Sequence, residues 1–363
     1  MTTTVSQNSS RRTTSRKPVG LALQGGGSWG AYTWGVLDAL LGSRTLTIDQ
    51  LSGTSAGAIN AAIVASALAN GSRAKARQAL RAFWMDVASP TVGAGHALWA
   101  PVERAWHESI NAWMLSSGTS PYQLNPLGIN PLRELIARHV DIAAIHSKGS
   151  PALYVTVTNV KTGLPRVIDN SAMSIDALLA SACLPQFFQA VEIDGEHYWD
   201  GGFSGNPTLW PMIHGGGMRD LIVVQLVPDE VADTPTDAPG IRRRIGEIVF
   251  NSSLVAEMQA ISAMRAIVDR NVAGAGVMDT RLHRIGPPRP ALLMQGSALE
   301  RSREWLLRLH GEGRAAARRF MRRHGADVGV RETLDLARVF SDGRKPKMHR
   351  SANEEAFDGR AAV

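Results

Sequence analysis

A serine between two glycines is the first feature of this sequence that could do covalent chemistry. Ser55 stands in Gly53-Thr-Ser-Ala-Gly57, between a short apolar stretch and a run of small residues typical of a helix. A nucleophile elbow requires such small neighbours, because the chain turns sharply there and lifts the serine hydroxyl clear of the backbone. A serine before an apolar helix also serves as a plain N-cap. The five residues alone do not separate these two interpretations.

A glycine-rich loop, Gly25-Gly-Gly-Ser-Trp-Gly30, precedes this serine by one helix and one strand. Closely spaced backbone N–H groups at the start of a helix bind anions, and they hold an oxyanion as readily as a phosphate. Such an anion-binding cradle would consist of the N–H groups of Gly25, Gly26, Gly27 and Ser28. The loop also fits the G-x-G-x-x-G fingerprint of dinucleotide-binding folds, with Asp49 about 20 residues further on. That alternative is weaker, because Asp49 does not close the second strand.

A carboxylate that could accept the serine proton occurs far downstream, in Asp200-Gly-Gly202. The preceding segment contains the pair Asp194-Gly195, which predicts a β-hairpin and places Asp200 at the end of a strand. A serine nucleophile needs such a base within hydrogen-bond reach. The competing interpretation is an ordinary Asp-Gly turn. A Ser-His-Asp triad is a further alternative. The histidines available for it include His139, His146, His197, His214 and His283.

Taken together and in this order, the three motifs closely resemble those of the patatin-like phospholipases. In that family a G-G-G-x-x-G loop provides the oxyanion hole, G-x-S-x-G carries the nucleophile, and D-G-[AG] carries the aspartate of a catalytic dyad. The resemblance runs from about Val19 to Val227 and includes Ala180-Ser-Ala-Cys-Leu-Pro185, similar to the family's A-S-x-x-x-P. It implies Ser55 as nucleophile and Asp200 as base, with an oxyanion hole formed by the N–H groups of Gly25, Gly26, Gly27 and Ser28. The motif glycines that it implies are Gly30, Gly53, Gly57, Gly201 and Gly202.

One position departs from the pattern of the family. Many members carry Arg or Lys as the second x of the glycine motif, whereas this sequence has Trp29. The backbone N–H donors survive the change, but a positive charge near the site is lost. We therefore expect ester hydrolysis more firmly than a preference for phospholipids, and Trp29 favours an apolar acyl group.

Strand-like and helix-like segments alternate along the chain. Short apolar or β-branched runs at 19–24, 45–51, 153–158 and 221–227 predict strands, and 31–41 and 56–68 predict helices. This alternation predicts an α/β fold with three layers, in which helices cover both faces of a mostly parallel central sheet. The resemblance implies the same patatin-like fold. Residues 300–323 predict a helix with one apolar face, either packed on this domain or lying at a lipid interface.

The sequence predicts four regions. They are a disordered basic tail (1–18), a catalytic domain (19–228) with an aromatic-rich insert (83–132), a C-terminal helical extension packed on that domain (229–339) and a polar tail (340–363). In the insert Trp99, Trp106 and Trp113 recur every seven residues and predict one helix face, which either joins the core or forms a lid beside a lipid-like substrate.

Composition narrows the classes of function. The 363 residues carry a net charge of +7 and contain one cysteine, Cys183, so an internal disulfide is impossible and a cytoplasmic location is expected. No run of about 18 apolar residues predicts a membrane-spanning helix. The basic chain ends favour peripheral contact with an anionic membrane or granule over nucleic acid, for which no recognition module is found. No pair of histidines or cysteines has metal-ligand spacing, so neither a metal nor a cofactor is expected.

These features predict a cytoplasmic serine acyl hydrolase of lipid carboxylic esters, of the phospholipase A or lipase type. Two alternatives stay open. The first is an intracellular depolymerase of hydroxyalkanoate polyester that uses the same dyad. The second is a non-catalytic lipid-binding or regulatory protein with this fold, against which the intact Ser55 and Asp200 argue. A dinucleotide-dependent oxidoreductase is more distant.

Overall fold

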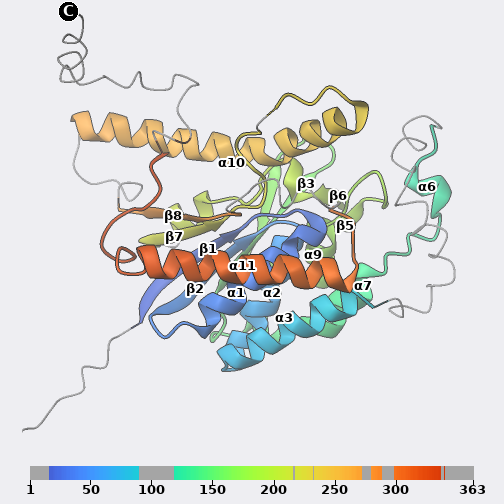
Figure 1. Cartoon of the computed structure of the whole chain (residues 1–363). Helices are drawn as coiled ribbons and strands as arrows, with labels where there is room; N and C mark the ends of the chain where they lie inside the picture. Colours follow the sequence, from blue (N-terminus) through green and yellow to red (C-terminus); the bar gives the residue numbers. More distant parts are fainter. Residues whose placement is uncertain are drawn as a thin grey trace, which may run out of the picture.

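One eight-stranded sheet forms the centre of the molecule (Figure 1). The structure is a computed structural model, and it describes residues 16–89, 118–215, 217–231, 233–271, 279–287, 298–336 and 339. The strand order is β5-β6-β3-β2-β1-β7-β8, and β4 pairs with β3. The strands are β1 (Lys17–Leu23), β2 (Leu46–Gly53), β3 (Ala152–Asn159), β4 (Pro165–Ile168), β5 (Val191–Ile193), β6 (Glu196–Asp200), β7 (Asp220–Val224) and β8 (Arg281–Ile285).

Five neighbouring strands of this sheet run parallel. β1 pairs in parallel with β2 and β7, β2 with β3, and β7 with β8, whereas the pairs β3–β4, β3–β6 and β5–β6 are antiparallel. Because the carboxyl ends of parallel strands meet at one edge of a sheet, the loops that follow β1 and β2 lie at the same edge. These are the loops that carry the glycine motif and Ser55.

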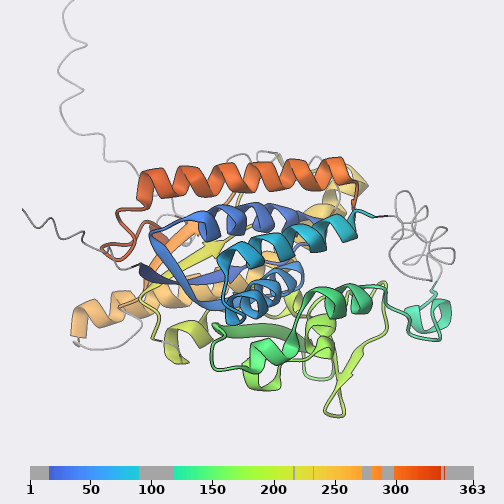
Figure 2. The same ribbon diagram turned by 90° about the horizontal axis from the view of Figure 1, so that it is seen from below.

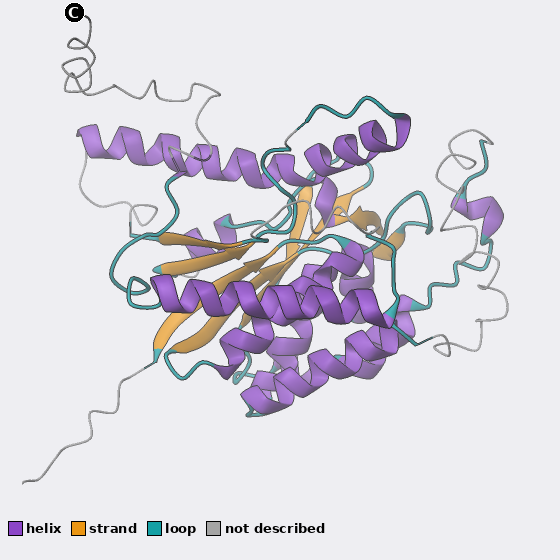
Figure 3. Cartoon of the chain, in the orientation of Figure 1, coloured by secondary structure: helices purple, strands orange, loops and turns teal. Residues whose placement is uncertain are grey.

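Helices account for most of the remaining described residues (Figure 3). The α-helices are α1 (Gly30–Gly42), α2 (Ala56–Ala69), α3 (Arg73–Val87), α6 (Pro121–Leu124), α7 (Leu132–His139), α8 (Ile142–His146), α9 (Ile175–Ser181), α10 (Ala238–Asn271) and α11 (Arg303–His324). The short 3₁₀ turns are η1 (Gly27–Trp29), η2 (Asn170–Ala172) and η3 (Gly201–Phe203), and η4 (Pro211–Gly215) is one π-helical turn.

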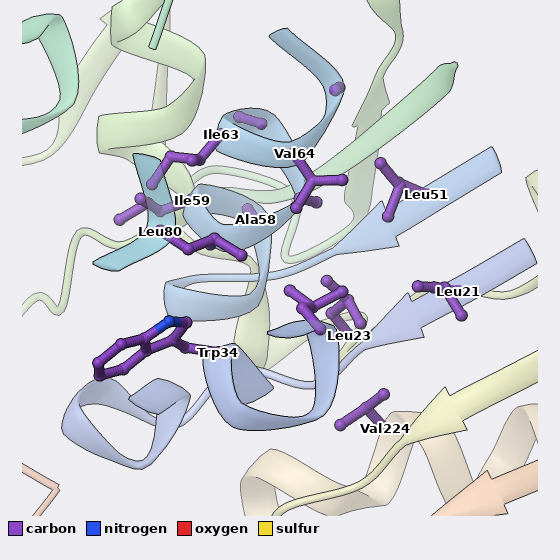
Figure 4. Packing of buried hydrophobic residues seen from close by; sticks show 14 of the residues in the cluster. Leu21, Leu23, Trp34, Leu51, Ala58, Ile59, Ile63, Val64, Leu80 and Val224 are labelled. Carbon is purple, nitrogen blue, oxygen red and sulfur yellow. The ribbon is translucent and has the colours of Figure 1, made fainter. Parts of the chain in front are cut away.

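The two faces of the sheet bury different cores, because successive side chains of a strand point to opposite faces. Leu21 and Leu23 of β1 join a core with α1, α2 and α11, which Figure 4 shows around Ile63 and Trp34. Ala22, between them, joins a second core to which α10 contributes Leu254. α10 thus lies on one face of the sheet and α1, α2, α3 and α11 on the other (Figures 1 and 2). The predicted three-layer α/β fold is confirmed.

Helix α11 packs closely along α1. The chain forms one helix from Arg303 to His324, although it contains Gly311 and Gly313 and glycine is a poor helix former. Gly313 allows the backbones of α11 and α1 to approach closely, since a Cβ atom there would lie 2.0 Å from the carbonyl oxygen of Tyr32. Trp305, Leu306, Leu309 and Phe320 are buried, so the apolar face of α11 belongs to the core and not to a lipid interface.

Some predicted regions need adjustment or lie outside the described residues. β1 begins at Lys17, so the predicted basic tail extends two residues too far. Region 229–339 contains α10, β8 and α11, and β8 pairs with β7 at one edge of the sheet. The three tryptophans of the insert and the polar C-terminal tail fall outside the described residues. Among the residues that the structure describes, no helix is long and apolar enough to cross a membrane.

Candidate active site

Ser55 sits at a sharp turn between β2 and α2. Its φ of 54° and ψ of −127° lie in a region that residues other than glycine rarely adopt. It occupies the N-cap position of α2, yet its side chain makes no capping hydrogen bond. An N-cap serine has β-region dihedrals and bonds the first helical turn, so the capping interpretation fails here. A strained backbone and a hydroxyl that makes no capping bond are features typical of a nucleophile elbow.

The glycines around Ser55 allow three backbones to meet. A Cβ atom at Gly57 would lie 2.2 Å from the carbonyl oxygen of Leu23, at the end of β1. A Cβ atom at Gly25 would lie 2.7 Å from the Cβ atom of Ser55. The glycine loop therefore packs directly against the nucleophile turn, and a larger residue at either position would force the two apart.

Asp200 ends β6 and is fully buried, with no exposed surface. Its Oδ1 atom accepts a hydrogen bond from the N–H of Gly202 at 2.7 Å, while Oδ2 completes no hydrogen bond of regular geometry with the residues described. Burial raises the pKa of Asp200 to about 7; the Gly202 N–H and the Ser55 side chain lower this pKa in part. The structure thus brings Asp200 next to Ser55, with one carboxylate oxygen held and the other uncommitted.

The four expected oxyanion donors divide into two pairs. The N–H of Gly25 donates to Oδ1 of Asn206 at 2.7 Å, and the N–H of Ser28 donates to the carbonyl oxygen of Ala298 at 2.7 Å. The N–H groups of Gly26 and Gly27 donate to no acceptor within the described part of the chain. Two adjacent donors therefore remain for a ligand, and the outer two hold the loop in place.

Buried amides brace the glycine loop, and the sequence motifs did not reveal this. Gln24, at the end of β1, accepts the N–H groups of Leu226 and Val227 at 2.7 and 2.8 Å. Its Nε2 atom donates to Oδ1 of Asn251 in α10 at 3.0 Å. Gln24 and Asn206 are both fully buried. The loop is thus fastened to β7 and to α10, which are remote in sequence.

Trp29 lies under the loop and not in solvent. Its side chain is 8% exposed and belongs to the core shared with α1 and α2. The ring lies against Gly26, where an added Cβ atom would be 3.3 Å from Cε3 of Trp29. The Nε1 donor has no hydrogen-bond partner among the described residues. An apolar ring therefore supports the loop at the position where many family members carry a basic side chain.

The five histidines considered for a triad lie elsewhere. His139 pairs with Asp86 at 2.8 Å, and Nε2 of His146 contacts the carbonyl oxygen of Met173 at 2.9 Å. His283 pairs with Asp220 at 3.1 Å and is fully buried. His197 and His214 are exposed, and His197 lies on the opposite face of β6 from Asp200. These contacts and positions disfavour a triad with any of these five.

Asp49, the acid that a dinucleotide site would require, lies away from the glycine loop. It occupies the first half of β2, beside a cavity of about 430 Å³ that Thr47, Arg73 and Gly149 also line. Ligands of open α/β sheets bind at the carboxyl ends of the strands, where Ser55 lies instead. The geometry therefore disfavours the dinucleotide interpretation.

A comparison with known families decides which class of enzyme this site belongs to. The family model for patatin-like phospholipase matches residues 21–213, more than half of the chain. The chain belongs to the patatin-like phospholipase family. Its family membership supports hydrolysis of lipid esters in general, and the matched residues include the glycine loop, Ser55 and Asp200.

The other two comparisons add less. No curated protein matches the sequence. Among solved structures, it is similar to VipD from Legionella pneumophila, with 13% sequence identity and a TM-score of 0.41 over 86% of this chain and 68% of that chain. A likeness at this score carries no argument about function.

Proposed function

We propose that this chain hydrolyses lipid carboxylic esters, as a phospholipase A or a lipase, with Ser55 as nucleophile and Asp200 as base. One observation carries the proposal, which is the position of a strained serine, whose side chain makes no capping bond, beside a fully buried aspartate. Strain at a residue that is not glycine persists where the surrounding structure enforces it, and it is concentrated at functional sites.

The reaction consists of acylation and deacylation of Ser55. Each of these two half-reactions needs the same proton acceptor and two proton transfers. Oγ of Ser55 attacks the ester carbonyl carbon while its proton passes to Oδ2 of Asp200. The tetrahedral intermediate then expels the alcohol, which takes the proton back from Asp200, and an acyl-serine remains. A water molecule attacks this acyl group as Asp200 accepts its proton. Collapse releases the carboxylic acid and returns the proton to Oγ of Ser55.

The pKa of Asp200 suits this role. A general base works best when its pKa lies near the working pH, because it is then ionised and still accepts a proton readily. A solvated aspartate, with a pKa near 3.9, would be a poor base for a serine hydroxyl. Burial raises the pKa of Asp200 to about 7 and so supports its assignment as the base.

We assign the oxyanion hole to the N–H groups of Gly26 and Gly27. These two lack acceptors among the described residues, whereas those of Gly25 and Ser28 already donate to Asn206 and Ala298. Donors fixed in advance stabilise the charge that develops on the carbonyl oxygen, and one donor contributes about 10²–10³-fold in rate. In this assignment Gly25 and Ser28 orient the loop and do not contact the oxyanion.

Turnover by purified variants tests the proposal. On a soluble p-nitrophenyl ester, Ser55→Ala is expected to abolish hydrolysis, and Asp200→Asn to lower kcat by about 10²–10⁴-fold. Circular dichroism should show that both variants are folded. Wild-type turnover by either folded variant would rule out the dyad.

The same preparations define the substrate. Fatty acid and lysophospholipid released from phospholipid vesicles would identify a phospholipase A, and hydrolysis of emulsified glycerides alone would identify a lipase. Trp29 favours the second outcome, because the site lacks the basic residue found in many relatives. Hydrolysis of hydroxybutyrate oligomers but of neither lipid would contradict the proposed substrate class and support the polyester alternative.

A further inference from the structure

The nucleophile's own backbone N–H is held by a side chain. Ser55 N–H donates a hydrogen bond to Oγ of Ser181 at 2.9 Å. The Ser181 hydroxyl in turn donates to the carbonyl oxygen of Thr156, in the middle of β3, at 2.8 Å. Ser181 is the last residue of α9 and is fully buried. One hydroxyl therefore bridges the nucleophile turn and the central sheet.

This bridge is needed because the turn removes Ser55 from regular hydrogen bonding. Thr54 N–H still bonds the carbonyl oxygen of Leu23, and Gly57 N–H bonds that of Thr54. Ser55, with a φ of 54°, faces neither the sheet ladder nor the helix, so its buried N–H needs another acceptor. Ser181 supplies that acceptor and holds the strained conformation in place.

The residues that follow Ser181 hold the base. The N–H of Asp200 donates to the carbonyl oxygen of Cys183 at 2.8 Å, two residues after Ser181. The next residue, Gly201, packs on the carbonyl oxygen that Ser181 bonds, since a Cβ atom there would lie 2.1 Å from the oxygen of Thr156. A single short segment, 181–183, therefore contacts both members of the dyad.

We propose that Ser181 is a positioning residue that sets the distance between Ser55 and Asp200. This inference rests on the proposed function. It also gives a physical role to the serine of the Ala180–Pro185 motif, which the sequence did not assign. Ser181 does not touch the substrate, because its hydroxyl is already committed to Ser55 and Thr156.

Replacing Ser181 with Ala tests the proposal, with Ser181→Cys as a milder variant whose thiol is a weak donor and acceptor of similar shape. We expect kcat for a soluble ester to fall by about 10–100-fold in Ser181→Ala, since a displacement of about 1 Å from the reacting geometry has an effect of this size. KM should change little, and Ser181→Cys should give an intermediate kcat.

A second readout separates positioning from general stability. The Ser55 side chain lowers the pKa of Asp200, so a displaced Ser55 should move the midpoint of the pH profile of kcat/KM upward. Ser66→Ala is the matched control, because Ser66 is a buried hydroxyl of α2 that donates to the carbonyl oxygen of Ile63 at 3.2 Å. It should lower only the melting temperature, if anything.

The outcomes distinguish the two levels of the argument. A lowered melting temperature in Ser181→Ala, with kcat and the pH midpoint of the wild type, would show a purely structural role and overturn the inference. If the wild type itself shows no hydrolysis that depends on Ser55, then the proposed function fails and the positioning role fails with it. Should Ser181→Ala not fold, the same comparison is made with Ser181→Cys, and an unchanged kcat in that variant is the contradicting result.

Discussion

The backbone N–H of Gly25 donates to the side chain of Asn206 across 2.7 Å, and this bond ties the glycine loop to the segment that follows Asp200. The side-chain amide of Asn206 also donates to the carbonyl oxygen of Phe250 in α10, at 2.9 Å. Asn206 is fully buried. One amide therefore joins the loop that we assign as oxyanion hole, the loop of the proposed base and the helix that covers this face of the sheet.

Replacing Asn206 with Ala should impair both stability and turnover. It would leave the Gly25 N–H without its acceptor and remove the bond between Asn206 and the Phe250 carbonyl oxygen, and an unsatisfied buried group costs about 1–3 kcal/mol. A glycine loop no longer held at Gly25 should also lower kcat by about 10–100-fold, because oxyanion donors must be oriented in advance. Urea unfolding and ester turnover measure the two effects. Asn70→Ala, which removes an exposed amide bonded to Asp141 at 3.2 Å, is the control. Normal kcat in Asn206→Ala would show that loop orientation does not depend on this residue.

The pH dependence of hydrolysis should report the ionisation of Asp200. A base must be deprotonated to act, so kcat/KM is expected to rise about tenfold per pH unit on the acid side and to level off above a midpoint near 7. Burial also raises the pKa of Glu257 to about 7, so this group needs a control. Glu257 accepts the N–H groups of Leu209 and Trp210 and lies outside the proposed dyad. Glu257→Gln should therefore show the same pH midpoint as the wild type. A shifted midpoint in this variant would assign the titration to Glu257 and contradict its assignment to Asp200.

The same shift predicts that Asp200 weakens the fold at high pH. The folded-state pKa of about 7 exceeds the unfolded value near 3.9, so the unfolded chain releases its proton first as pH rises. Below about pH 4 Asp200 is protonated in both states, and its contribution to the stability of the fold is fully present. This contribution is lost as pH rises to about 7, because the unfolded chain ionises more readily than the buried carboxyl group. Asp200→Asn should accordingly melt at a higher temperature than the wild type at pH 8, with the difference shrinking toward pH 4. Thermal unfolding at several pH values gives the comparison, and a lower melting temperature of Asp200→Asn at pH 8 would contradict the raised pKa.

Two glycines of α11 should respond oppositely to the same substitution. A Cβ atom at Gly313 would lie 2.0 Å from the carbonyl oxygen of Tyr32, whereas nothing lies within 4 Å of one at Gly311. Gly313→Ala should therefore force α11 away from α1 and destabilise the protein by about 1–3 kcal/mol. Gly311→Ala should stabilise it by about 0.5–1 kcal/mol, since Ala loses less backbone freedom in a helix. Denaturant unfolding of both variants decides the matter, and equal effects would contradict the close packing of the two helices.

Local pattern was sufficient to predict the frame of this fold. Buried strands and helices that begin with small residues can be recognised from a few neighbouring residues in the sequence. The observed bounds therefore lie within a few residues of the predicted ones for β1, β2, α1, α2 and the hairpin of β5 and β6. The hairpin turns at Asp194 and Gly195, both with positive φ, as an Asp-Gly pair predicts. The order of the three motifs along these elements was enough to indicate the family.

The bonds that orient the site could not be predicted in this way. The glycine loop and the nucleophile turn are held by residues that are remote in sequence, namely Asn206, Ser181 and Ala298. The shortest separation of a bonded pair is 126 residues, for Ser55–Ser181, and the longest is 270, for Ser28–Ala298. No local sequence pattern around these residues indicates that they contact the site. The motif therefore does not rank the four candidate donors of the oxyanion hole. Tertiary contacts occupy the N–H groups of Gly25 and Ser28 and leave those of Gly26 and Gly27 without acceptors among the described residues.

Helix α10 is a second case in which local pattern was not enough. It spans Ala238–Asn271 but includes Gly246 and two adjacent serines, Ser252 and Ser253, which are poor helix formers. Leu254 and Met258 pack on the sheet and stabilise it, so tertiary contacts override weak propensity. The helix matters for the site because Phe250 packs against Gly202, next to Asp200. A Cβ atom at Gly202 would lie only 2.3 Å from Cε1 of Phe250.

The most direct test of the central claim is to treat the wild type with a fluorophosphonate and locate the adduct by peptide mass spectrometry. We expect one adduct, on Ser55, formed in the wild type and absent from Ser55→Ala, with labelling slowed in Asp200→Asn. An adduct on another serine, or none on Ser55 in folded protein that hydrolyses esters, would contradict the assignment of Ser55 as the nucleophile.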